Sequence, residues 1–136
     1  MRIVGLDVGE KRIGIASGDT ESHIAVPAGA VERSNVQADV QAVLAEVTAR
    51  EAEIIVVGMP LSMSGRTGPQ AESVAGFIQI LGTLTGLSIV TVDERLTTVE
   101  ATRRMREGGA KRGKATRGDV DAAAAAIILQ SYLDSR

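Results

Sequence analysis

The first third of the chain alternates short apolar runs with glycine, a pattern typical of strands joined by tight turns. A mostly apolar run covers Ile3 to Val8 and stops at Gly9. From Arg12 to Ser17, isoleucines alternate with small residues, as expected for a second strand, and the two runs predict a hairpin. A third strand is expected over Ala28 to Glu32, after Pro27. The sheet should therefore open with antiparallel strands.

The rest of the chain changes to alternating helices and strands. Ser34 or Asn35 can cap a helix, because valines and leucines then recur at helical spacing as far as Val47. Apolar runs at Glu53–Met59 and Leu87–Val92 predict strands that are covered on both faces. Further helices are predicted over Gln70–Leu84, from Thr97 or Thr98 to about Arg106, and from about Asp119 to Leu133.

This order of elements predicts an α/β fold with a mixed five-stranded sheet flanked by helices. The first three strands should be antiparallel, and the later crossovers should make parallel pairs. At 136 residues, the chain is expected to form a single domain over residues 1–136. In such a sheet, ligands gather at the carboxyl ends of the parallel strands, so functional residues are expected there.

Composition excludes several classes of chemistry. Cysteine is absent, so disulfides, thiolate metal sites and cysteine nucleophiles are excluded. Phe77 and Tyr132 are the only aromatic residues, which disfavours the stacking platforms of single-strand binders. The first residues, MRIVGLDVGE, lack a signal-peptide pattern, and no stretch approaches about 18 apolar residues. We therefore expect a cytoplasmic protein with no membrane partner.

Carboxylates stand at two predicted strand ends. Asp7 ends the first strand, where burial of a lone carboxylate is costly unless a metal ion, a helix N-terminus or an arginine meets it. Asp93 and Glu94 end the last strand, and strand periodicity puts them on opposite faces. Either could instead cap a helix or pair with Arg95. We assign the site role to Glu94 and keep Asp93 as the alternative.

Two more carboxylates open the last predicted helix. Asp119 fits ordinary capping of a first helical turn. Asp121 lies about one turn before Ala125 and shares with Ile128 the face that must pack inward, so its carboxylate should point at the sheet. We therefore favour Asp121 as the ligand.

The three preferred carboxylates predict metal-assisted cleavage of a phosphodiester. Asp7, Glu94 and Asp121 offer oxygen ligands, which suit a hard divalent ion. Two such ions about 4 Å apart would activate the attacking water and stabilise the leaving oxygen. No general-base histidine is needed, and His23, the only histidine, is expected at the surface or in a turn.

The net charge of −2 conceals one strongly basic segment. Residues 103–117 hold seven basic residues against Glu107, whereas the remaining chain has eight basic and sixteen acidic residues. The segment includes a predicted loop over residues 108–118, which is either a solvated surface loop or a clamp for a nucleic-acid backbone. Its place directly before Asp121 favours the clamp. The expected phosphate contacts are Lys111, Arg112, Lys114 and Arg117.

Other basic residues lie close to the predicted strand ends. Lys11 and Arg12 occupy the predicted hairpin turn, Arg66 lies in the loop after the central strand, and Arg95 follows Glu94. We predict phosphate contacts for all four. The alternatives are a solvated turn for the first two, a mobile crossover loop for Arg66, and an ion pair with an aspartate for Arg95.

Four stretches together resemble the YqgF or RuvX-like family over nearly the whole chain. They are LDVGEKRIGIASGD, IIVVGMPLSMSGRTG, VDERLTTVEA and KATRGDVDAAAAAIILQSYL, in the family's order and spacing. The resemblance implies a ribonuclease H-like fold, a requirement for Mg²⁺ or Mn²⁺, and acidic site residues at Asp7, Glu94 and Asp121. Asp119 occupies a position where similar proteins often carry another residue, so it is expected to be auxiliary at best.

The resemblance also implies the substrate. Family members are described as pre-16S rRNA nucleases, which implies processing of the 5′ end of that precursor in ribosome biogenesis. The related Holliday junction resolvases act instead on four-way DNA junctions. The expected partner is therefore a structured RNA precursor or branched DNA. Junction cutting would further favour a homodimer with two sites.

Two other classes of protein compete with a nuclease. A non-catalytic nucleic-acid-binding module would keep the basic loop without cutting, but three acids near a phosphate path would repel the ligand unless metal neutralised them. An actin-like phosphotransferase also starts its nucleotide loop with an Asp and Gly hairpin. Such an enzyme needs a second lobe, for which this chain has no residues left.

Overall fold

The computed structural model describes residues 1–61, 68–98 and 116–136, and it confirms the predicted α/β fold. These residues form a five-stranded sheet of order β3-β2-β1-β4-β5. The first three strands pair antiparallel, whereas β4 pairs parallel with both β1 and β5. The strands are β1 (Arg2–Val8), β2 (Arg12–Asp19), β3 (Ile24–Glu32), β4 (Ile54–Met59) and β5 (Ser88–Asp93). The helices are α1 (Val36–Ala49), α2 (Pro69–Leu84), the short 3-10 helix η1 (Glu94–Leu96) and α4 (Arg117–Asp134).

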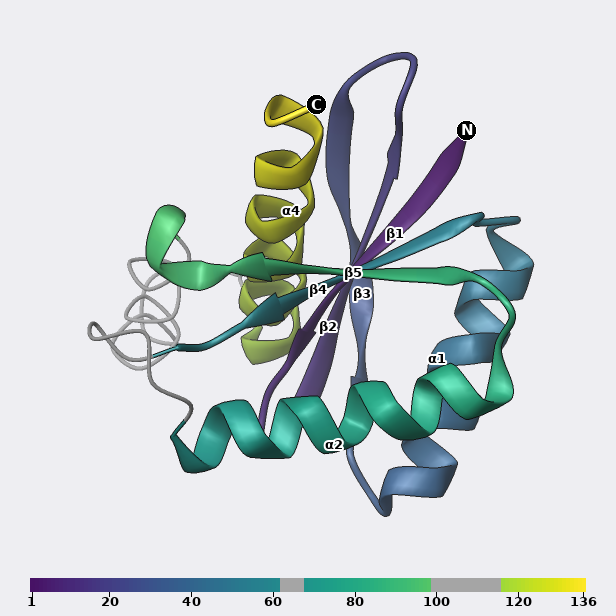
Figure 1. Ribbon diagram of the computed structural model, residues 1–136, viewed down its shortest axis with the longest axis vertical. Coiled ribbons are helices and arrows are strands. Elements are labelled where there is room, and N and C mark those ends of the chain that lie inside the picture. The colour runs from purple at the N-terminus through teal and green to yellow at the C-terminus, as the bar shows by residue number, and fades with distance from the viewer. Residues whose placement is uncertain (62–67, 99–115) are drawn as a thin grey trace.

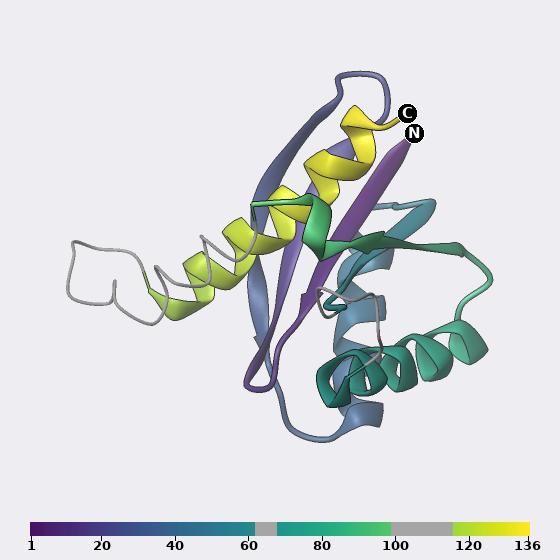
Figure 2. The same ribbon diagram turned by 60° about the vertical axis from the view of Figure 1, so that its left-hand side comes forward.

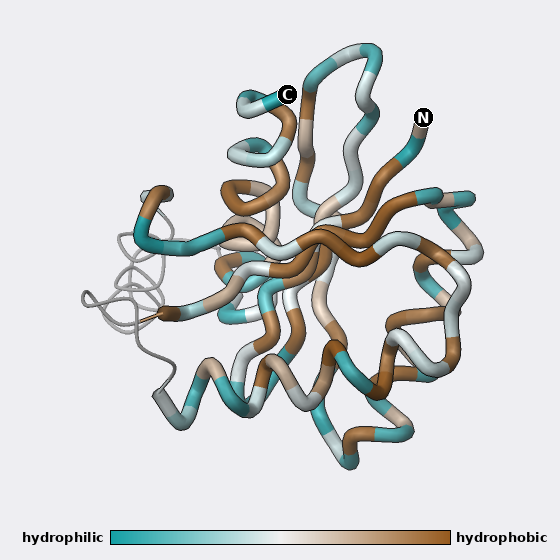
Figure 3. The backbone as a smooth tube through the Cα atoms, viewed as in Figure 1, coloured by the Kyte–Doolittle hydropathy of each residue, from teal (hydrophilic) through white to brown (hydrophobic). Residues whose placement is uncertain are grey.

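The helices cover both faces of the sheet (Figures 1 and 2). Figure 2 shows α4 on one face and α1 with α2 on the other. The central strand β1 is buried by both layers, because Ile3 belongs to the apolar cluster under α4 and Leu6 to the cluster under α1 and α2. Hydropathy follows this arrangement, with brown, hydrophobic stretches of the tube concentrated at the centre of the molecule (Figure 3).

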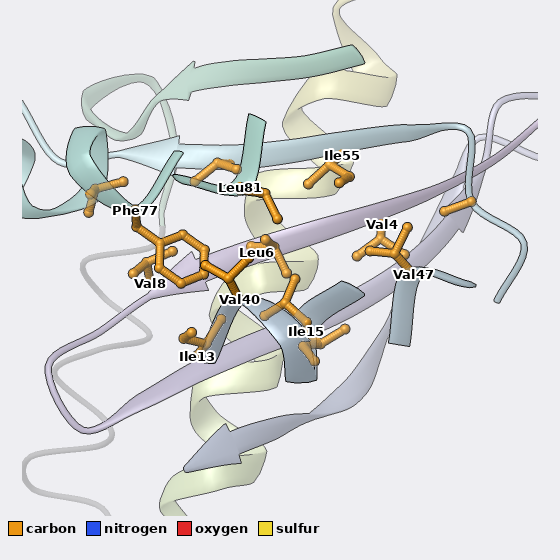
Figure 4. Packing of buried hydrophobic residues seen from close by; sticks show 14 residues of the cluster. Val4, Leu6, Val8, Ile13, Ile15, Val40, Val47, Ile55, Phe77 and Leu81 are labelled. Carbon is orange, nitrogen blue, oxygen red and sulfur yellow. The ribbon is translucent and has the colours of Figure 1, made fainter. Parts of the chain in front are cut away.

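The cluster under α1 and α2 is the larger of the two apolar clusters. Figure 4 shows Phe77 and Leu81 of α2 and Val40 of α1 packed onto side chains from β1, β2 and β4. Each of these three residues is at most 2% exposed. Burial of such a side chain contributes about 1.5–3 kcal/mol, so this face supplies much of the stability of the fold.

Strand β3 is longer than predicted. It begins at Ile24 rather than at Ala28, and it pairs with β2 along its whole length. Pro27 had indicated a break, but β3 is an edge strand and its register with β2 shifts next to Ala16, the partner of Pro27. A residue without an N–H donor is tolerated at such edge positions and irregularities.

The helix ends follow the capping chemistry of the sequence. Asn35 caps α1, because its side chain accepts a hydrogen bond from Ala38 N at 2.9 Å. Thr116 caps α4, so that helix starts two residues earlier than predicted. The helix predicted from Thr97 or Thr98 to about Arg106 lies almost entirely outside the described residues, as does most of the predicted basic loop. None of the helices within the described ranges is long and apolar enough to cross a membrane.

Candidate active site

Three neighbouring strands carry a row of positions on the α4 face, near the carboxyl ends of β1 and β4. The central position is Asp7, because its neighbour Leu6 points to the opposite face. Gly14 of β2 is paired with Asp7 across the antiparallel ladder. Gly58 of β4 follows Val57, the parallel partner of Leu6, so it lies beside Asp7 on the other side. With strands about 4.8 Å apart, the row spans about 10 Å.

Both glycines make room for an element that carries a carboxylate. A Cβ added to Gly14 would lie 2.0 Å from the backbone oxygen of Asp121, so α4 packs directly onto β2 there. A Cβ added to Gly58 would lie 2.7 Å from Oε2 of Glu94. Asp7 therefore has Asp121 above one neighbouring position and Glu94 above the other. The three predicted carboxylates lie at one end of the sheet. Asp7 and Asp121 are each 2% exposed, and Glu94 is 6% exposed.

The start of α4 holds Asp121 in place. Thr116 and Asp119 form a capping box, in which each side chain accepts a hydrogen bond of 3.0 Å from the backbone N–H of the other. Asp119 is exposed and acts as a capping residue, as its place in the first turn predicted. Two residues later, Asp121 faces the sheet, as its helical spacing predicted.

The end of β5 separates its two adjacent acids. Glu94 is buried, whereas Asp93 accepts hydrogen bonds of 3.0 Å from the backbone N–H and from Nε of Arg95. The hydrogen bond from the Arg95 side chain lowers the pKa of Asp93, and the same contact raises the pKa of Arg95. Asp93 thus has the capping and ion-pairing role that was the alternative to chemistry, and Glu94 is the acid directed at the site.

Arg12 makes a contact that the sequence did not reveal. Its Nε donates a hydrogen bond of 2.7 Å to Oδ2 of Asp121, and its Nη1 lies 3.8 Å from Oε1 of Glu32 on β3. The hydrogen bond to Asp121 raises the pKa of the guanidinium. The Arg12 side chain is only 14% exposed. An arginine predicted to contact phosphate is therefore bound to one of the three site acids.

The donor types of the site fit a hard divalent ion, but their spacing in this conformation does not enclose one. Asp7, Glu94 and Asp121 supply carboxylate oxygens, the ligands that Mg²⁺ and Mn²⁺ prefer. Across the described part of the chain, however, no three acidic or histidine side chains are grouped closely enough to hold a metal ion. Asp121 is directed at the guanidinium of Arg12 instead.

Of the remaining residues predicted to contact phosphate, two are exposed near the three acids and four lie outside the described residues. Lys11 is exposed in the turn between β1 and β2, and Arg117 is exposed at the first residue of α4. Arg117 precedes Asp121 by four residues, so the two share one side of the helix. The predicted contacts of Arg66, Lys111, Arg112 and Lys114 lie outside the described residues.

A second buried ion pair, also unexpected from the sequence, supports the turn next to Asp7. Arg33 donates from Nε to Oδ2 of Asp39 at 3.0 Å and from Nη1 to the carbonyl oxygen of Gly9 at 2.9 Å. Asp39 is 2% exposed. An acid four positions after the capping Asn35, preceded by Arg33, was the available signal. This pair fixes the turn that carries Lys11.

Removing the cap of α4 should disturb the site more than the same change elsewhere. We expect Thr116→Ala to lower the free energy of unfolding by about 1 kcal/mol and to loosen the turn that precedes Asp121. Asn35→Ala removes the cap of α1 and should cost a similar amount without affecting the acids. Urea unfolding with amide hydrogen exchange at residues 119–122 checks both. Equal exchange at these amides in the two variants would contradict the prediction.

Comparisons with known proteins identify the family of the chain. The family model RuvX, described as Holliday junction resolvase, matches residues 1–135. A protein of Protochlamydia amoebophila is 46% identical over 99% of this chain and 94% of its own length, and one of Caldanaerobacter subterraneus subsp. tengcongensis is 44% identical over 100% and 98%. Both carry the name "Putative pre-16S rRNA nuclease".

Solved structures share the fold at low sequence identity. T. thermophilus RuvC in complex with a Holliday junction substrate has a TM-score of 0.62 at 20% identity, covering 100% of this chain and 96% of RuvC. The fowlpox virus resolvase bound to junction DNA has a TM-score of 0.58 at 12% identity, covering 99% and 98%. These likenesses confirm the ribonuclease H-like fold. The family-model match over residues 1–135 and the relatives at 44% and 46% identity show that the chain belongs to the RuvX family.

Proposed function

We propose that this chain is a metal-dependent nuclease that hydrolyses phosphodiester bonds and processes the 5′ end of pre-16S rRNA in the cytoplasm. The observation that carries the proposal is the convergence of Asp7, Glu94 and Asp121, all buried, at one end of the sheet. Burial of three like charges is costly, and a bound cation would offset that cost together with Arg12, which already pairs with Asp121. The names of the relatives support the RNA substrate.

Asp7, Glu94 and Asp121 would hold Mg²⁺ or Mn²⁺. When bound, the ion supplies the positive charge that activates a water molecule and stabilises the leaving oxygen. The protein contributes position, since β1, η1 and α4 carry the acids, and the absence of a Cβ at Gly14 and Gly58 lets Asp121 and Glu94 approach the sheet on either side of Asp7. This arrangement confines the reacting phosphate to the carboxyl end of the sheet.

Basic residues around the acids would bind the nucleic-acid backbone. Lys11 and Arg117 are exposed on the two elements that flank Asp7 and Asp121, so they can reach the phosphates on either side of the bond to be cut. Such contacts carry no sequence information, so recognition would depend on backbone shape. We propose the same role for Arg12, Arg66, Arg95, Lys111, Arg112 and Lys114.

A four-way DNA junction is the second candidate substrate. It is favoured by the description of the family and by the DNA complexes of the two structural neighbours. Paired cuts in a junction require two sites related by symmetry, so this alternative also requires a homodimer. The actin-like phosphotransferase has no support from the family match.

The test is cleavage of both substrates under matched conditions. A labelled pre-16S rRNA fragment and a four-way DNA junction are incubated with the protein in Mg²⁺, in Mn²⁺ and in chelator. We expect metal-dependent cleavage near the mature 5′ end of the RNA. Glu94→Gln should abolish this activity, whereas Glu53→Gln, an exposed acid at the opposite end of β4, should retain it.

Each outcome selects one function. Cleavage of the junction alone would replace the RNA proposal with a DNA resolvase. Binding in chelator without cleavage in either metal would instead identify a non-catalytic binding module. Cleavage that persists in Glu94→Gln would show that the activity comes from another site or from a contaminant.

A further inference from the structure

The buried carboxylate of Asp121 is neutralised by a cation from its own chain. Its side chain is 2% exposed, and Nε of Arg12 donates a hydrogen bond of 2.7 Å to its Oδ2. A buried ion without a counter-charge would be strongly unfavourable. Arg12 therefore supplies, in this conformation, the positive charge that a metal ion would supply to the same carboxylate.

A metal ion and Arg12 would compete for Asp121. Both are cations, and a short charge-assisted hydrogen bond from Nε lowers the electron density that Oδ2 can give to a metal. The conformation agrees with such competition, because no three of the described acidic or histidine side chains are grouped around a common metal position. Asp121 would complete the site only after turning from Arg12.

Arg12 has a second acceptor within reach. Its residue is paired with Glu32 across the β2–β3 ladder, and its Nη1 lies 3.8 Å from Oε1 of that carboxylate. The Glu32 side chain is 79% exposed, whereas Arg12 is only 14% exposed. Arg12 would therefore keep Glu32 as an ion-pair partner if it released Asp121.

We propose that Arg12 occupies the place of the metal ion in the metal-free protein, where its guanidinium neutralises Asp121. When metal binds, Arg12 releases Asp121 and pairs with Glu32 or with a substrate phosphate. The proposal rests on the proposed metal-dependent function. Arg12 is then a positioning residue with two states, and its release links metal loading to phosphate binding. By reciprocity, Arg12 weakens metal binding as much as metal weakens the contact between Arg12 and Asp121.

The proposal predicts opposite effects of Arg12→Gln on stability and on metal affinity. In chelator, the variant should melt about 5 °C or more below the wild type, because the buried carboxylate of Asp121 loses the charge-assisted hydrogen bond from Arg12. Its affinity for Mn²⁺ should be roughly 10-fold higher, because the competing cation is gone. Saturating Mn²⁺ should restore most of the lost melting temperature. Calorimetric titration with Mn²⁺ and thermal unfolding, both without nucleic acid, measure these effects.

The chain contains a matched control in the ion pair of Arg33 and Asp39. Its geometry is similar, with Nε 3.0 Å from Oδ2 and side chains that are 15% and 2% exposed. Arg33→Gln loosens the turn next to Asp7 but takes no cation away from Asp121, so it should lower the melting temperature without raising the affinity for Mn²⁺. Lys11→Gln removes an exposed neighbouring charge and should change Mn²⁺ affinity by less than about twofold. Together these variants separate the Asp121 contact from general loss of stability and of charge.

Glu32→Gln provides a second test that does not threaten the fold. Loss of the exposed acceptor should weaken Mn²⁺ binding by roughly two- to fivefold, since Arg12 then leaves Asp121 less readily. If the wild type binds Mn²⁺ and Arg12→Gln binds it no more tightly, Arg12 does not compete with the metal ion, and the proposed nuclease function is unaffected. If wild type shows neither binding nor stabilisation by Mn²⁺ or Mg²⁺, both proposals fail. Unchanged affinity in Glu32→Gln would also overturn the two-state role.

Discussion

Asp7→Asn should abolish cleavage and at the same time make the metal-free protein more stable. Asp7 is the central member of the row on the α4 face, with the other two acids above the positions on either side. Because changes to residues that only support metal ligands cost about 10–100-fold, loss of this acid should cost about 100-fold or more in cleavage rate. The amide is isosteric and removes one of three like charges from a buried site. We therefore expect a gain of roughly 1 kcal/mol in unfolding free energy in chelator.

The measurement pairs single-turnover cleavage with urea unfolding in chelator. Asp19→Asn is the matched control, since Asp19 ends β2 at the opposite end of the sheet, opposite Arg2 of β1. Hydrogen bonding from the backbone N–H of Glu21 lowers the pKa of Asp19, which shows a turn-capping role. Asp19→Asn should leave cleavage unchanged. If Asp7→Asn kept more than about a tenth of the wild-type rate, Asp7 would not be a metal ligand.

Gly14→Ala should be among the most damaging single methyl additions. The new Cβ would lie 2.0 Å from the carbonyl oxygen and 2.4 Å from the carbonyl carbon of Asp121, and 3.1 Å from the backbone nitrogen of Ala122. These are backbone atoms, so α4 as a whole must move away from β2. We expect a loss of about 3 kcal/mol or more in unfolding free energy. If Asp121 is displaced by about 1 Å, cleavage should also fall by about 100-fold.

Gly76→Ala is the control for Gly14→Ala. Gly76 is exposed within α2, and a Cβ there meets nothing within 4 Å. This substitution should stabilise the protein by about 0.5–1 kcal/mol, because alanine is the better helix former. Thermal and urea unfolding of both variants, with cleavage assays, test the pair. A Gly14→Ala protein as stable as wild type would show that α4 does not pack onto β2 this closely.

Much of the fold and the three acids could be predicted because each rests on a local pattern. The isoleucine alternation after Arg12 indicated β2, and the helical spacing of Asp121 indicated that it faces the sheet. Strand periodicity indicated that Asp93 and Glu94 lie on opposite faces, and the structure buries Glu94 while it pairs Asp93 with Arg95.

The contacts of Arg12 could not be predicted in the same way. Its partner Asp121 is 109 residues away, and the pairing depends on how closely α4 approaches β2. That approach depends in turn on Gly14 having no side chain. The start of β3 was missed for a related reason. Pro27 is acceptable only because its strand is at the edge of the sheet, which no local pattern reveals.

The sheet separates the two apolar clusters, and this separation determines how the protein can change. None of the buried residues in the cluster under α1 and α2 is a candidate site acid, whereas α4 carries both Asp121 and much of the other cluster. Substitutions at Val40, Val47 or Leu81 should therefore alter thermal tolerance while leaving the chemistry intact. Selection for growth temperature can therefore act on the face covered by α1 and α2, and selection for substrate on the face covered by α4. The core under α1 and α2 can be repacked by design without changing the face that carries the acids.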